Sequence, residues 1–79
     1  MKYYSIEQDF NTNQSLRMPH SVGAAQQKLI DIVNSENGEI VKVHISEYED
    51  PFSMDHDRRG TVAILYKAEG LTSRMFKGM

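Results

Sequence analysis

The most chemically suggestive stretch of the sequence is the segment 53–59, which reads Ser-Met-Asp-His-Asp-Arg-Arg. Asp55, His56 and Asp57 carry the oxygen and nitrogen atoms that divalent ions accept as ligands. Adjacent ligands on one loop rarely close a metal site, and their spacing matches neither a zinc-protease helix nor an EF-hand. The sequence therefore predicts no metal and no cofactor. Two interpretations remain: a solvated loop whose charges pair locally, or a surface that binds a partner.

No catalytic constellation accompanies these side chains. His44 lies between Val43 and Ile45, where a histidine is more often structural than catalytic. The sequence contains neither a Gly-x-Ser-x-Gly nucleophile elbow nor a glycine-rich phosphate-binding loop. It also contains no cysteine, which excludes disulfides and thiolate metal sites. We therefore expect a protein that is not an enzyme.

Residue types that are enriched at protein interfaces surround the acidic stretch. Tyrosine, phenylalanine and methionine are interleaved with acids, and two arginines follow. Apolar anchors inside a charged rim suit a contact in which a few residues carry most of the binding energy. The candidate partner-binding residues are Tyr48, Phe52, Met54, Asp55, Asp57, Arg58 and Arg59.

A second function class is a nucleic-acid-associated regulator. Its phosphate contacts would come from Arg58, Arg59, Arg74 and Lys77. The formal net charge of −2 argues against general nucleic-acid binding, because such domains are usually strongly basic. A protein partner is therefore the favoured prediction.

Length and composition limit the class of protein. A chain of 79 residues makes one domain, and such a domain buries only roughly 60% of the surface of its unfolded chain. Neither a signal-like apolar run nor a stretch of about 18 apolar residues occurs, so we expect a cytoplasmic protein without a membrane span. Domains this small often gain stability from a partner subunit. Together with a sheet face that a single helix leaves uncovered, this favours a homo-oligomer.

The clearest element is a helix over 21–35. Ser21 is a suitable N-cap, and the run that ends in Gly38 stops the helix, with Gly38 able to adopt the left-handed conformation. The apolar positions recur every three or four residues, as on one buried helical stripe. They are Val22, Ala25, Leu29, Ile32 and Val33.

Three strands accompany this helix. The sequence predicts them over 1–10, 39–48 and 61–67, with loops over 11–20 and 49–60 and a tail over 68–79. The third strand is apolar on both faces, which is typical of a central strand. A crossover helix makes the first two strands parallel. The expected fold is therefore α+β, β-α-β-β, with one helix on a three-stranded sheet of order 1-3-2 and a possible short C-terminal element.

The predicted loop over 49–60 is long for a hairpin, whose loops usually have about 2–5 residues. Pro51 also prevents the strands from simply extending through it. The apolar side chains of the loop cannot all reach a core built on one helix. We therefore expect Phe52 and Met54 to be at least half exposed.

One helix cannot cover both faces of a sheet. Ile40, His44, Ala63 and Leu65 are expected on the uncovered face, and exposed apolar sheet surface generally marks an interaction site. The tail, with Leu71, Met75 and Phe76 at helix-like spacing, either docks on its own core or anchors another subunit.

In length and order of elements the chain resembles small phage-encoded accessory proteins, including some anti-CRISPR inhibitors. The corresponding stretches are the opening strand over 2–7, the amphipathic helix over 22–33 and the hairpin over 38–66. The resemblance covers most of the chain as a layout and includes no diagnostic motif. It implies a protein that inhibits a host complex by occluding a surface.

Overall fold

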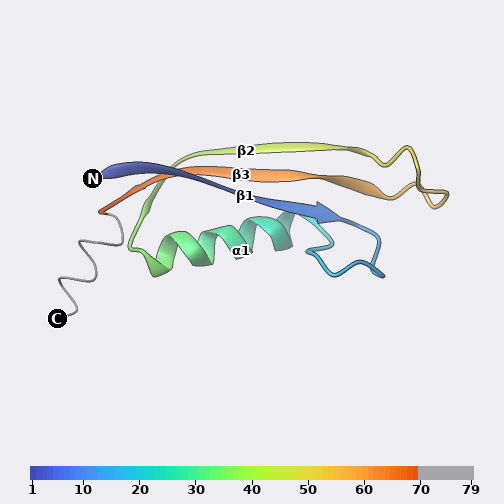
Figure 1. The fold of residues 1–79 in the computed structure, drawn as a ribbon, viewed down its shortest axis with the longest axis horizontal. Coiled ribbons are helices and arrows are strands. Elements are labelled where there is room, and N and C mark those ends of the chain that lie inside the picture. The colour runs from blue at the N-terminus through green and yellow to red at the C-terminus, as the bar shows by residue number, and fades with distance from the viewer. Residues whose placement is uncertain (70–79) are drawn as a thin grey trace.

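A computed structural model describes residues 1–69 of the chain. The elements are β1 (Lys2–Asn11), α1 (Val22–Ser35), β2 (Glu39–Glu49) and β3 (Arg58–Ala68), as Figure 1 shows. The predicted order β-α-β-β is confirmed. The third strand is longer than predicted at both ends, so Ala68 belongs to β3. Glu69 of the predicted tail follows β3 without regular secondary structure, and residues 70–79 lie outside the described residues.

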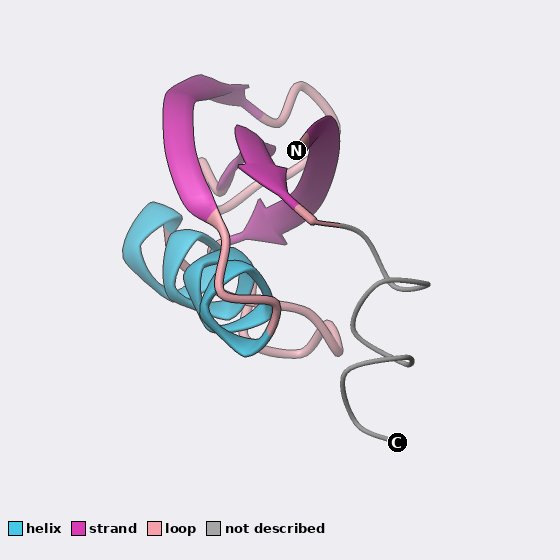
Figure 2. Cartoon of the chain, turned by 90° about the vertical axis from the view of Figure 1, so that its left-hand side faces the viewer, coloured by secondary structure: helices cyan, strands magenta, loops and turns pink. Residues whose placement is uncertain are grey.

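The three strands form one antiparallel sheet of order β1-β3-β2, as predicted. Both β1 and β2 pair antiparallel with β3, so they run in the same direction on either side of it. The central position of β3 agrees with its composition, because a strand with a neighbour along each edge is shielded most from solvent and tends to be apolar on both faces. Figure 2 shows α1 on one side of the twisted sheet.

Side-chain and backbone hydrogen bonds fix both ends of α1. The Ser21 hydroxyl accepts from the backbone N–H of Ala24 at 3.1 Å, which confirms the predicted N-cap. At the other end, the Gly38 N–H donates to the Val33 carbonyl at 2.9 Å, in a Schellman arrangement. The left-handed residue there is Asn37, with φ 53°, and not Gly38 as predicted. Asparagine tolerates this conformation because its short polar side chain bonds locally.

The core lies between α1 and the two strands β1 and β3. Alternate residues of β3 point toward the helix and are buried, whereas the helix contacts β2 least. The buried apolar residues are Phe10, Ala25, Leu29, Val33, Val62, Ile64, Tyr66 and Ala68. The predicted helical stripe is correct except for Ile32, which is exposed, while Ile30 packs partly against the core.

Tyr66 is the buried core residue with an ionisable group. Its hydroxyl donates to Oε2 of Glu36 at 2.7 Å. Burial, together with this hydrogen bond and the charge of Glu36, raises the pKa of Tyr66 to about 12. A raised folded-state pKa contributes stability that is fully present below the ordinary tyrosine pKa near ~10 and is lost as the pH rises through about 12.

We therefore expect the domain to lose stability between about pH 10 and pH 12. In an absorbance titration of the four tyrosines, Tyr66 should ionise last. Tyr66→Phe should remove the late component and reduce the alkaline loss of stability. Tyr3→Phe, a change at an exposed tyrosine, should leave both unchanged. A titration in which Tyr66→Phe removes an early component would contradict the assignment.

The face of the sheet away from α1 is more polar than predicted. Cross-strand partners share a face, so Lys42, which pairs with Leu65, and His44, which pairs with Ala63, lie on the uncovered side. Ile40 pairs with Tyr66 and therefore lies on the helix side, contrary to the prediction. The cause is a register shift between Ile40 and Lys42, which leaves one extra residue in β2.

Strand β2 is exposed along its whole length, and every residue of Glu39–Glu49 is accessible to solvent. Its apolar side chains on the helix side extend beyond the area that α1 covers. The exposed apolar surface of the sheet is therefore at the β2 edge and not at the centre of the uncovered face. Among residues 1–69, no helix has the length and apolar character needed to cross a membrane.

Candidate functional site

The loop between β2 and β3 projects from one end of the molecule, beyond the end of α1 (Figure 1). It is shorter than the predicted 49–60, because β2 continues to Glu49 and β3 begins at Arg58. The Asp50 N–H donates to the Asp57 carbonyl at 2.8 Å and closes the base of the loop. Phe52, Met54 and Asp55 thus lie on a turn with a defined base.

Ser53 organises the interior of this turn. Its hydroxyl donates to Oδ2 of Asp57 at 2.8 Å and accepts the backbone N–H groups of Asp55 and Asp57. The Asp50 carboxylate accepts the N–H of Phe52 at 2.9 Å, in the local turn typical of an aspartate before proline. These bonds hold the loop backbone without any contact to the core.

A second connection joins the loop to the start of the 12–20 segment. The Thr12 hydroxyl donates to Oδ1 of Asp57 and accepts the Arg58 N–H, while the Thr12 N–H donates to the Arg58 carbonyl at 2.9 Å. Asp57 therefore has a structural role at the base of the loop. It is not a free acidic group of the predicted binding surface.

Phe52 and Met54 are the most exposed large apolar residues of the described chain, at 90% and 95% of their full accessible surface. The expectation that both are more than half exposed is confirmed. Their backbone is held by the Ser53 and Asp50 hydrogen bonds, so the two side chains are presented by an ordered turn. Such exposure gains nothing for folding, because neither side chain is removed from water.

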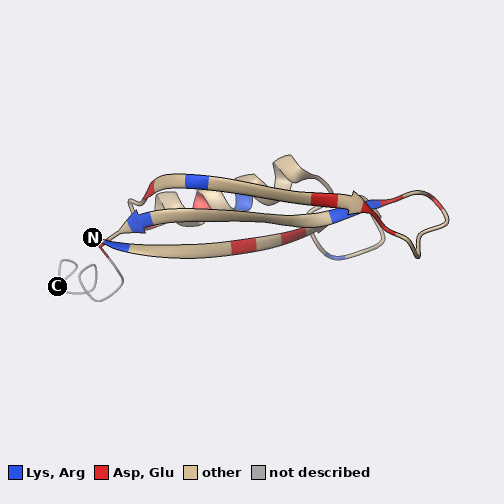
Figure 3. Ribbon diagram, turned by 90° about the horizontal axis from the view of Figure 1, so that it is seen from above, with Lys and Arg blue, Asp and Glu red and all other residues tan. Residues whose placement is uncertain are grey.

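Charged side chains pair around the base of the hairpin. Arg58 lies 3.3 Å from Glu47, and the His56 ring contacts the Glu49 carboxylate. Figure 3 shows the acidic residues that gather at this end of the molecule. Both pairs are solvent-exposed and contribute only about 0–1 kcal/mol each. Within residues 1–69, no group of three histidine, aspartate or glutamate side chains is arranged to hold a metal ion.

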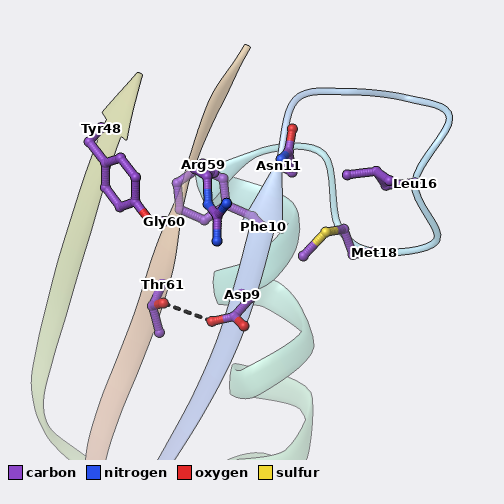
Figure 4. A pocket seen from close by; sticks show the side chains of 9 residues that line it. All are labelled: Asp9, Phe10, Asn11, Leu16, Met18, Tyr48, Arg59, Gly60 and Thr61. Carbon is purple, nitrogen blue, oxygen red and sulfur yellow. Dashed lines mark hydrogen bonds between the residues drawn. The ribbon is translucent and has the colours of Figure 1, made fainter. Parts of the chain in front are cut away.

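Tyr48 and Arg59 lie apart from the loop tip, on the uncovered face of the sheet. The Arg59 guanidinium lies over the Tyr48 ring, 5.7 Å from its centroid. Both side chains line a hollow of about 270 Å³, to which the 12–20 segment contributes Leu16 and Met18 (Figure 4). Thr61 and Asp9 also line the hollow, and the Thr61 hydroxyl donates a hydrogen bond to the Asp9 carboxylate. This hollow has the volume of about one large side chain.

The seven predicted partner-binding residues therefore divide into three groups. Phe52, Met54 and Asp55 form the exposed tip, Asp57 and Arg58 hold the base, and Tyr48 and Arg59 flank the hollow. The sequence interpretation missed Ser53 and Thr12. The Asp-Pro-x-Ser sequence of 50–53 is a turn signal that indicates the role of Ser53. Thr12 carries no such signal, because its contacts span 46 residues of sequence.

The chain was compared with protein-family models, curated proteins and solved structures. None of the three comparisons gives a match for this chain.

Proposed function

We propose that this chain is a non-enzymatic protein-binding module that acts by covering a surface of its partner, with the 50–57 loop as its principal contact. The single observation that supports this function most strongly is the near-complete exposure of Phe52 and Met54 on a hydrogen-bonded turn. Large apolar side chains on an ordered, projecting loop are well suited to enter pockets of a partner.

The order of the loop reduces the cost of binding. A flexible loop loses backbone conformational freedom when it is immobilised in a complex, at about 1–2 kcal/mol for each residue. Here Ser53 and Asp50 fix the backbone before any partner arrives. The surrounding acidic residues would form the polar rim and select a partner with basic groups around its pocket.

Affinity capture from the native host tests the proposal. The double variant Phe52→Ala/Met54→Ala should lose the captured protein and keep the wild-type melting temperature, because both side chains are exposed. Tyr3→Ala is a matched control, since Tyr3 is a large apolar residue that is 66% exposed and lies on β1, away from the loop. The Tyr3→Ala variant should capture the same protein as the wild type. The binding should also be observed between the purified wild-type chain and the purified captured protein.

A double variant that folds and still captures the protein would contradict the proposal, because the contact would then lie outside the 50–57 loop.

The nucleic-acid alternative predicts a different salt dependence of binding in the same assay, because phosphate contacts weaken steeply as the salt concentration rises. The observations favour it less. Residues 1–69 carry seven Lys and Arg against eleven Asp and Glu, a net charge of −4, and Arg58 is paired with Glu47. Arg74 and Lys77 lie outside the described residues.

A further inference from the structure

Strand β2 is an unpaired edge of the sheet that residues 1–69 form. β3 pairs with one side of it, and no strand of residues 1–69 pairs with the other. It contains eleven residues and no proline, so a long row of backbone donors and acceptors faces outward. Such an edge is a template for pairing with another strand.

The side chains of β2 add apolar surface to this edge. Val43 and Ile45 pair with Ile64 and Val62 of the core strand, so they lie on the helix side of the sheet. They nevertheless remain 36% and 43% exposed, because α1 packs chiefly on β1 and β3. The core is therefore incomplete on the β2 side.

The overall dimensions agree with a missing covering element. The radius of gyration is 15.3 Å, and the molecule extends over 52 × 22 × 16 Å. A compact domain of about this size has a radius of gyration of roughly 11–12 Å. Figure 1 shows that the hairpin of β2 and β3 extends beyond α1, and no other helix or strand of residues 1–69 covers it there.

The features that protect natural edge strands are confined to the start of β2. Such strands commonly carry charged side chains, especially lysine, or a β-bulge, and in β2 these are Lys42 and the irregularity between Ile40 and Lys42. The three glutamates of β2 each have a basic side chain of the same molecule beside them: Glu39 has Lys67, Glu47 has Arg58 and Glu49 has His56. Within residues 1–69, Lys42 is the one charged residue of β2 without an ion pair.

We infer that β2 pairs antiparallel with β2 of a second copy of this chain, with His44 at the two-fold axis. The product is a continuous six-stranded antiparallel sheet with both helices on the same face. An edge strand can always pair with its own copy about a two-fold axis, and the resulting interface is self-complementary. This inference is independent of the proposed contact at the hairpin loop.

The register follows from the side chains on the helix side. With His44 opposite itself, Val43 lies opposite Ile45 of the second copy, and Ile45 lies opposite Val43. The four side chains form one apolar cluster between the two helices. A shift of two residues in one direction places Glu47 against Val43, and in the other it places Lys42 against His44. The His44-centred register avoids both pairings within residues 42–46, and Val41, which falls opposite Glu47, lies at the irregularity between Ile40 and Lys42, outside this segment.

The length of the paired segment is sufficient for a specific interface. Residues 42–46 of the two copies pair, because the irregularity between Ile40 and Lys42 leaves Ile40 and Tyr48 on opposite faces of the sheet and ends the regular pairing there. This segment gives roughly five backbone hydrogen bonds, at the lower end of the range for stable interfaces. Stable interfaces typically contain about 10 ± 5 direct hydrogen bonds. The antiparallel arrangement also places the two 50–57 loops at opposite ends of the sheet. The dimer thus presents two projecting tips and can bind two partner sites at once.

Light scattering of the whole chain measures the association directly. We expect a mass twice 9.1 kDa at 100 µM, and Ile45→Lys should return the mass to that of one copy by placing a charge in the apolar cluster. Tyr3→Lys is the matched control, because it adds the same charge at an exposed residue of the opposite edge strand, and it should leave the mass doubled.

Disulfide cross-linking tests the register of the paired strands, and its result does not depend on whether the Ile45→Lys variant folds. The chain has no cysteine, so His44→Cys introduces a single thiol at the two-fold axis. Directly opposed strand residues have Cα atoms about 4.5–5.5 Å apart, within the range of a disulfide, whereas a shift of two residues exceeds it. His44→Cys should form a covalent dimer on mild oxidation, and Ser5→Cys on β1 should not.

A wild-type chain of single mass at 100 µM overturns the inference, whether residues 70–79 or a different protein covers β2. A dimer that cross-links through Ser5→Cys and not through His44→Cys also overturns it, because the β1 edge would then be the interface. A doubled mass with cross-linking at position 44 supports both the edge and the register.

Discussion

Leu29→Ala should lower the free energy of unfolding by about 2–5 kcal/mol. Leu29 is 1% exposed and lies at the centre of the apolar cluster between α1 and the sheet. Removing it takes away contacts that the rest of a small core cannot replace by relaxing. A domain of this length has a total stability of only about 4–12 kcal/mol, so the variant should be largely unfolded at 37 °C if the wild type lies near the lower limit.

Urea denaturation of the wild type and the variant measures this difference. Ile32→Ala is the matched control, because it removes a side chain of similar size from the same helix at a residue that is 41% exposed. We expect it to cost less than about half as much as Leu29→Ala. Equal losses for the two variants would mean that α1 is rotated about its axis relative to the described packing.

The fold was predictable from the sequence because several local signals agree. Ser21 marks the start of the helix, the Asn34–Gly38 run marks its end, and the 3.6-residue period identifies the buried side. The strand from Val62 to Tyr66 is apolar on both faces, which places it between the other two. The crossover connection then leaves few topologies that bury this strand and cover one face of the sheet.

The orientation of β2 was not predictable at its start. A single extra residue between Ile40 and Lys42 moves Ile40 to the opposite face of the sheet, and no glycine or proline marks the irregularity. The solvent exposure of the apolar side chains of β2 was also not predictable. Val41, Val43 and Ile45 alternate with polar residues as in a half-buried strand, yet all three are exposed because the helix packs toward β1.

The candidate site was predictable in part. The length of the loop and the position of Pro51 indicate that Phe52 and Met54 cannot reach the core, and both are exposed. The separation of Tyr48 and Arg59 from the tip depends on strand register, which places them on the uncovered face. The structural role of Asp57 depends on Thr12, a contact between distant parts of the sequence that local patterns do not report.

Gly60→Ala should destabilise the domain about as much as a truncation in the core. A Cβ atom at this position would lie 1.9 Å from the Ser46 carbonyl oxygen and 2.8 Å from Cα of Glu47. Both atoms belong to the backbone of β2, so no rotation of a side chain can relieve the contact. The two strands of the hairpin must separate at this point, although Gly60 also pairs with Phe10 on β1.

We expect Gly60→Ala to lower the free energy of unfolding by about 3 kcal/mol or more, and the melting temperature by at least about 12 °C. Gly23→Ala is the matched control, because a Cβ atom at this helical glycine meets nothing within 4 Å. Alanine there should raise stability by about 0.5–1 kcal/mol, since glycine loses more backbone freedom on folding. The same chemical change should thus move the melting temperature in opposite directions at the two positions. If Gly60→Ala melts with the wild type, β2 and β3 do not approach each other at Ser46 as described, and the register that places Tyr48 beside Arg59 is wrong as well.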